Sequence, residues 1–122
     1  MNAIAEDLWP SDIAADVPVT PVNILKAQAA RIGEKTKNIV EGAVRTSSSG
    51  DMIHSFRLVA PALDNYSYEL FRISHSVALY PVTVLPTGRT LRSEDDFVSW
   101  LKEQLSSPQT RQIVSSLIAQ SS

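Results

Sequence analysis

Cysteine is absent from the 122-residue sequence, and glycine is scarce. Without cysteine the chain has no disulfide bond, no thiolate metal ligand and no cysteine nucleophile. The four glycines are too scattered to form a glycine-rich phosphate-binding loop: Gly33, Gly42, Gly50 and Gly88. These absences exclude cysteine-dependent enzymes and nucleotide-binding proteins that use such a loop.

Histidine is also rare, with only His54 and His75 in the sequence. Both lie in neighbouring extended segments, and Asp51 is the nearest candidate for a third metal ligand. No His-Glu-x-x-His zinc motif occurs, and no serine lies in a Gly-x-Ser-x-Gly motif. We therefore predict no catalytic residues, no metal site and no cofactor, and we favour a protein that is not an enzyme.

Lysine and arginine are missing from the first twenty residues, which hold four acidic residues: Glu6, Asp7, Asp12 and Asp16. A secretory signal needs a basic start and an apolar run, and neither is present. No stretch approaches the roughly 20 apolar residues of a membrane span. We therefore expect a cytoplasmic protein without membrane association. The rest of the chain has only a mild basic excess, so nucleic acid is not an expected partner.

The chain is short enough for one domain, which we divide into an acidic N-terminal arm, residues 1–20, and a single α+β domain, residues 21–122. Pro18 and the proline that follows the arm keep this junction extended. Two interpretations of the arm remain open. Trp9 and Ile13 could pack against the chain's own core, or the arm could dock on a partner or on a second copy of the chain.

Four extended segments occupy the middle of the chain, at 39–46, 52–60, 66–74 and 79–85. Helical patterns lie before and after them, with Thr20, Ser93 and Ser107 as N-caps. The sequence therefore predicts an α+β two-layer sandwich: a four-stranded antiparallel meander preceded by one helix and followed by a two-helix hairpin. Pro81 places the fourth strand at an edge of the sheet.

Strand register follows from the turn between the first two strands. We interpret Ser48-Ser49-Gly50 as a three-residue loop with Gly50 in the left-handed conformation, which places Glu41 opposite Arg57. The next hairpin then pairs Arg57 with Glu69. Opposite charges in one row across three strands favour this register and mark the outer face of the sheet.

The predicted outer face is unusually apolar. The inner face would hold Val40, Val44, Phe56, Leu58, Tyr68, Leu70, Val82 and Val84, and the outer face Ile53, Val59, Phe71, Ile73, Leu79 and Leu85. Two explanations remain open. A β-bulge near Leu70 and Phe71 could switch the alternation, or the arm, a partner or a second subunit could cover the face. We favour covering.

We predict a non-catalytic interaction protein, of the small inhibitor, immunity or adaptor type, that acts as a homodimer through this apolar sheet face. The candidate interface residues are Ile53, Val59, Phe71, Ile73 and Trp9. The alternative is a small-molecule-binding module or minor enzyme with a cleft between sheet and helices. The candidate ligand rim of that cleft is His54, Tyr68, Arg72 and Tyr80.

Overall fold

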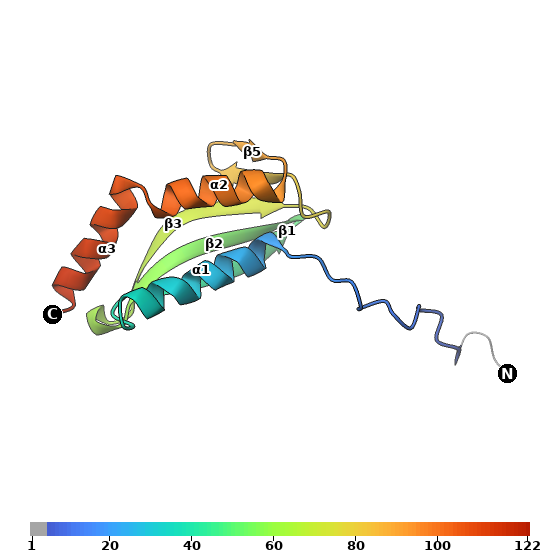
Figure 1. Ribbon diagram of the computed structural model, residues 1–122, viewed down its shortest axis with the longest axis horizontal. Helices are drawn as coiled ribbons and strands as arrows, with labels where there is room; N and C mark the ends of the chain where they lie inside the picture. Colours follow the sequence, from blue (N-terminus) through green and yellow to red (C-terminus); the bar gives the residue numbers. More distant parts are fainter. Residues whose placement is uncertain (1–4) are drawn as a thin grey trace.

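The structure is a computed structural model and describes residues 5–122. These residues form three helices, one open sheet of five antiparallel strands and a short 3-10 turn (Figure 1). In chain order the elements are α1 (Pro21–Lys35), β1 (Glu41–Ser49), β2 (Asp51–Ala60), η2 (Pro61–Leu63), β3 (Tyr66–His75), β4 (Val82–Leu85), β5 (Thr90–Leu91), α2 (Glu94–Leu105) and α3 (Pro108–Gln120). The α+β class is confirmed.

The sheet has one strand more than predicted, with the order β1-β2-β3-β4-β5. The two-residue strand β5 pairs with β4, and Val82 faces Leu91 across this pairing. The fourth strand is therefore not an edge strand. Pro81 lies just before β4, where its missing N–H breaks no ladder hydrogen bond.

The β1–β2 hairpin is tighter than predicted. Strand pairing continues to Ser49 and Asp51, so that only Gly50, with φ of 87°, lies between paired residues. The register consequently differs by two residues from the prediction, and Glu41 faces Val59 instead of Arg57. A shift of two preserves the side-chain alternation, so the predicted inner and outer faces of β2 remain correct.

The β2–β3 pairing contains a β-bulge at Leu70. Arg57 faces Glu69, as predicted, but Phe56 faces Phe71, which leaves Leu70 as an extra residue on β3. The bulge reverses the alternation beyond it. Phe71 is only 8% exposed and Ile73 is fully buried, so their predicted place on the outer face was wrong.

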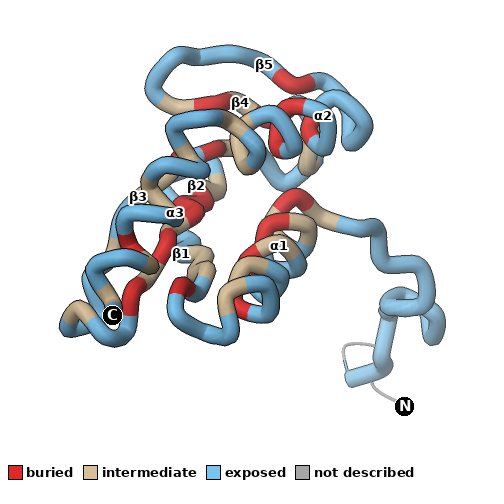
Figure 2. Tube along the Cα trace, turned by 60° about the vertical axis from the view of Figure 1, so that its left-hand side comes forward, coloured by how far each residue is buried: buried red, intermediate tan, exposed pale blue. Residues whose placement is uncertain are grey.

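Helices α1 and α2 cover one face of the sheet, as Figures 1 and 2 show. Gly42 allows α1 to approach β1 closely, because a Cβ at this position would lie 2.5 Å from the Cα of Ala29. Helix α2 packs on β3 through Trp100, which is 4% exposed and contacts Phe71 edge-on, with ring centroids 4.9 Å apart. The helical spacing of Phe97, Trp100, Leu101 and Leu105 predicts an apolar stripe that faces the sheet, and the burial of Trp100 confirms this.

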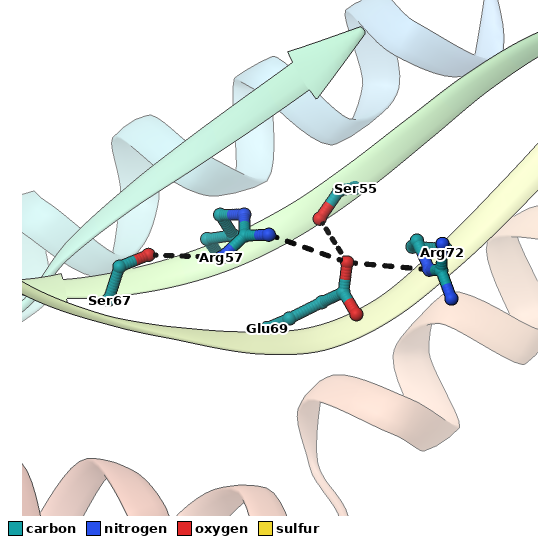
Figure 3. A network of polar contacts seen from close by, with 5 residues as sticks. All are labelled: Ser55, Arg57, Ser67, Glu69 and Arg72. Atoms are coloured by element: carbon teal, nitrogen blue, oxygen red, sulfur yellow. Dashed lines mark hydrogen bonds and ion pairs between the residues drawn. The ribbon is translucent and has the colours of Figure 1, made fainter. Parts of the chain in front are cut away.

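The opposite face of the sheet carries a polar network (Figure 3). One oxygen of Glu69, Oε1, accepts a hydrogen bond of 2.6 Å from the Ser55 hydroxyl. The same oxygen lies 3.7 Å from Nη2 of Arg57 and 3.5 Å from Nε of Arg72. An antiparallel sheet can leave such a polar face to water.

Candidate functional site

A groove lies on the helical side of the sheet, between α1 and the C-terminal helices. We call it the α1–α3 groove, and its volume is about 180 Å³. Three groups of residues line it: Gln28, Arg31, Ile32 and Lys35 from α1; Phe56, Leu58 and Leu70 from the sheet; and Leu105 from α2 with Thr110 and Val114 from α3. Its floor is therefore apolar, and one of its walls is partly polar.

The α1 wall follows from helical periodicity. Positions 28, 31, 32 and 35 are spaced by three, one and three residues, so these side chains share one stripe of the helix. Arg31 and Lys35 are the charged residues that line the groove, and its lining within residues 5–122 includes no acid. Arg31 pairs with Glu34 at 3.5 Å, but both side chains are 66% exposed. Such an exposed pair is weak, and Glu34 is not among the residues that line the groove, so the lining carries only basic charge, on α1.

The bulge on β3 contributes directly to the floor of this groove. Leu70, the extra residue, lines it beside Phe56 and Leu58. The residue is partly exposed, whereas Phe56 and Leu58 are buried. The local irregularity that the sequence pattern left open therefore supplies an accessible apolar side chain to the groove.

A larger and shallower cavity, of about 710 Å³, lies on the other side of α3. It is lined by Leu63, Tyr66, Tyr68, Gln109, Gln112, Ile113, Ser116, Leu117 and Gln120. Amide, phenol and aliphatic groups predominate, and no charged side chain belongs to this lining in the described part of the chain. Residues of α3 line both this cavity and the α1–α3 groove, and Leu117 is the one buried residue of the helix.

The two histidines meet inside the core. His54 and His75 are 1% and 4% exposed, and their Nε2 atoms are 2.8 Å apart. The predicted pairing of Arg57 with Glu69, continued along a regular ladder, would place His54 opposite Arg72. The bulge instead places His54 opposite Ile73, and His75 faces Met52. The pKa of His54 is lowered, first by burial and then by the nearby His75 and Lys26. Within residues 5–122 no further metal-ligating side chain joins the pair into a group of three.

The candidate ligand rim is dispersed. His54 lies in the core, and Tyr68 lines the cavity beside α3. Arg72 contacts Glu69 on the outer sheet face. The hydroxyl of Tyr80 is buried without a hydrogen-bond partner among residues 5–122, and its pKa is raised by burial and by Glu94. The structure therefore does not bring these four residues to one cleft.

The candidate interface residues are dispersed as well. Ile53 and Val59 lie partly buried on the outer sheet face, while Phe71 and Ile73 belong to the core. Trp9 lies in the arm and is 74% exposed. Together with the charged network around Glu69, this leaves the outer face less apolar than predicted.

The arm extends away from the body of the protein (Figure 1). Between residues 5 and 20 its large apolar side chains are all more than half exposed: Leu8, Trp9, Ile13, Val17 and Val19. The interpretation in which Trp9 and Ile13 pack against the chain's own core was therefore wrong. A turn shapes the middle of the arm, where the N–H of Ile13 donates to the carbonyl of Pro10 at 3.2 Å.

The sequence predicts a cleft between sheet and helices only as an alternative, and none of the four residues assigned to its rim lines the α1–α3 groove. Arg31 and Lys35 were missed because charged residues on one side of an amphipathic helix usually face solvent. The groove arises from the distance between α1 and α3, which no local pattern specifies. Comparisons with protein-family models, curated proteins and solved structures gave no match. Among the described residues, no helix has the length and apolar character needed to cross a membrane.

Proposed function

We propose that the protein is a non-catalytic binding module that recognises an apolar and acidic polypeptide segment in the α1–α3 groove. The observation that carries this proposal is the groove itself: an apolar floor of Phe56, Leu58 and Leu70 beside a rim that bears Arg31 and Lys35. An anchoring side chain would enter the floor, and acidic neighbours would face the basic rim.

The size of the groove favours a side chain over a free ligand. Small-molecule sites usually enclose about 300–1,000 Å³. The α1–α3 groove, at about 180 Å³, is smaller than this range. One aromatic or branched aliphatic side chain, delivered by a polypeptide, is the occupant that this volume supports.

The proposed class is the interaction protein of inhibitor, immunity or adaptor type expected from the sequence, but the proposed surface differs. Phe71 and Ile73 are buried, so the outer sheet face retains fewer apolar residues than the prediction required. Arg57 lies between Ile53 and Val59 on this face of β2 and pairs with Glu69 across the sheet, so a charged pair separates the two apolar residues. The helical side offers a concave apolar surface, the α1–α3 groove.

A peptide selection tests the proposal. Random peptides displayed on phage are panned against the protein lacking residues 1–18, which leaves Thr20 to cap α1. Enriched peptides should combine an aromatic or aliphatic residue with acidic ones. They should lose binding to Gln28→Trp, in which the new side chain fills the groove, and retain binding to Ala27→Trp, which adds the same group on the exposed side of α1.

Peptides that bind both variants equally would place the binding surface elsewhere. A selection that enriches no groove-dependent peptide would refute the proposed function. Circular dichroism of both variants provides the folding control.

The cavity beside α3 supports a second candidate function, the binding of an uncharged polar small molecule. Its volume of about 710 Å³ lies within the usual range for such sites, and Tyr68, Gln112 and Gln120 offer hydrogen-bonding groups. Native mass spectrometry of the purified protein should then detect a bound small molecule. Tyr68→Ala should release that molecule, whereas Gln28→Trp should not.

A further inference from the structure

We propose that the α1–α3 groove takes the acidic arm of a second copy of this chain, so that two copies exchange their arms. This inference rests on the proposed function and names the partner. In the resulting dimer each copy would supply one arm and one groove. The apolar residues of the arm that are left exposed in the single chain would then be covered.

The arm carries the side chains that the groove requires. Trp9 is 74% exposed and Leu8 beside it is 79% exposed, although apolar groups of this size are normally removed from water. The turn between Pro10 and Ile13 gives this part of the arm a compact shape. A single large side chain such as Trp9 could occupy the apolar floor while its neighbours remain at the rim.

Charge also matches between the arm and the groove. The first twenty residues contain four acids and no lysine or arginine, and Asp7 and Asp12 flank the Trp9 segment. The groove presents Arg31 and Lys35 without an acid among its lining residues, as far as the described chain extends. Exposed ion pairs of this kind contribute only about 0.2–1 kcal/mol each. They would orient the arm, while apolar burial supplies most of the stabilisation.

The conformation of the chain between the arm and α1 favours binding of the arm to the groove of a second copy over the groove of the same chain. The groove begins at Gln28, seven residues into α1, so an arm in its own groove would have to reverse and run back along its own helix. Pro18 and Pro21 hold the residues before them extended. Thr20 has ψ of 155°, and its hydroxyl caps the N–H of Asn23 at 3.1 Å. The chain is therefore directed away from the body (Figure 1).

Charge reversal on the two sides provides the test. One variant carries Arg31→Glu and Lys35→Glu in the groove, and the other carries Asp7→Lys and Asp12→Lys in the arm. Each alone places like charges together, so sedimentation should show self-association at least about ten-fold weaker than in the unmodified chain. In an equimolar mixture both arms meet a groove of opposite charge, and a mixed dimer should form.

A matched control is the variant with Arg89→Glu and Arg92→Glu, which has the same net charge as the groove variant. Both residues are exposed and lie outside the lining of the groove. This variant should dimerise as the unmodified chain does. If it loses association as the groove variant does, net charge alone explains the effect and arm exchange is wrong.

The fluorescence of Trp9 gives a second measurement. In a Trp100→Phe background Trp9 is the single tryptophan, and its emission should move to shorter wavelength as dimer forms. An emission that is already shifted in a chain that sediments as a monomer would place the arm in its own groove and overturn the exchange. A chain that remains monomeric with Trp9 in water overturns it too, as does a dimer that persists without residues 1–18.

These outcomes are separable from failure of the proposed function. If peptides selected from the library bind the groove but the charge-reversed mixture forms no dimer, arm exchange fails and the binding module stands. If neither peptides nor arms depend on the groove, both proposals fall.

Discussion

The imidazole rings of His54 and His75 share a hydrogen bond of 2.8 Å between their Nε2 atoms, inside the core. Nδ1 of His75 lies 2.7 Å from the carbonyl oxygen of Ser76 and must donate to it, which leaves Nε2 of neutral His75 as an acceptor. His54 then donates through Nε2, and its Nδ1 accepts from the hydroxyl of Thr46 at 2.9 Å. The hydrogen bonds therefore run in one direction, from Thr46 to Ser76, when both rings are neutral.

Stability should fall as the pH is lowered below about 6.5, the ordinary pKa of histidine. Burial, His75 and Lys26 lower the pKa of folded His54, so between these two pKa values the unfolded chain binds a proton that the folded chain does not. Stability is therefore full above about pH 6.5 and is lost as the pH falls towards the folded pKa. Urea midpoints measured over this range should decrease. His54→Gln, which can replace both hydrogen bonds of the ring, should flatten the dependence; an unchanged slope would assign it to other groups.

Replacing Trp100 with alanine should lower the free energy of unfolding by about 3–5 kcal/mol, because it removes a buried aromatic side chain and leaves a cavity. Trp100 contacts Phe71 edge-on and lies stacked with Phe97, with ring centroids 6.2 Å apart. Val98→Ala on the same helix is the control, since Val98 is 45% exposed and should cost less than about 1 kcal/mol. Urea unfolding measures both, and similar losses would show that Trp100 is not a principal anchor of α2.

Gly42→Ala should destabilise the protein by about 1–3 kcal/mol, as overpacking in a close contact does. The new methyl group would lie 2.5 Å from the Cα of Ala29 and 2.8 Å from its carbonyl oxygen, so the backbone of α1 would have to shift. Gly33→Ala is the matched control. There the nearest atom is Oδ1 of Asn38 at 3.2 Å, which belongs to a side chain that can move. Thermal unfolding should show a clearly lower midpoint for Gly42→Ala, and equal midpoints would contradict the close approach.

Ile73→Lys should lower the free energy of unfolding far more than Ile53→Lys does. A regular alternation of the strands would place both residues on the outer face. Ile73 is fully buried beyond the bulge, so a lysine there should cost more than about 4 kcal/mol or prevent folding. Ile53 is only partly buried on the outer face and should tolerate lysine at a cost below about 1 kcal/mol. Circular dichroism and urea titration distinguish the two, and a harmless Ile73→Lys would show that β3 has no bulge.

The helices and their first residues could be predicted because their signals are local. Thr20, Ser93 and Ser107 each cap the helix that they precede, accepting from the N–H three residues on. Burial of Trp100 followed from its place in an apolar helical stripe. The alternation of β2 also survived a two-residue error in register, because side chains repeat their direction every two residues.

The bulge and the groove depend on relations that are not local. Leu70 and Phe71 are both apolar, so either side chain could point into the core. Pairing with β2 determines that Leu70 is the unpaired residue of the bulge. The strand β5 has only two residues, too few for a period to be visible. Whether Trp9 is buried depends on the surface that the folded domain presents to the arm, which the sequence of the arm does not specify.

The bulge also determines where the chain can change its length. Deleting Leu70 alone would leave Glu69 opposite Arg57 and Phe71 opposite Phe56, now as consecutive pairs of a regular ladder. Deleting a residue of β3 far from Leu70 would instead turn over the segment between that residue and the bulge and carry core side chains into water. Leu70 is thus an insertion in an otherwise regular strand. Homologues one residue shorter at this position would keep the fold and give up part of the groove floor.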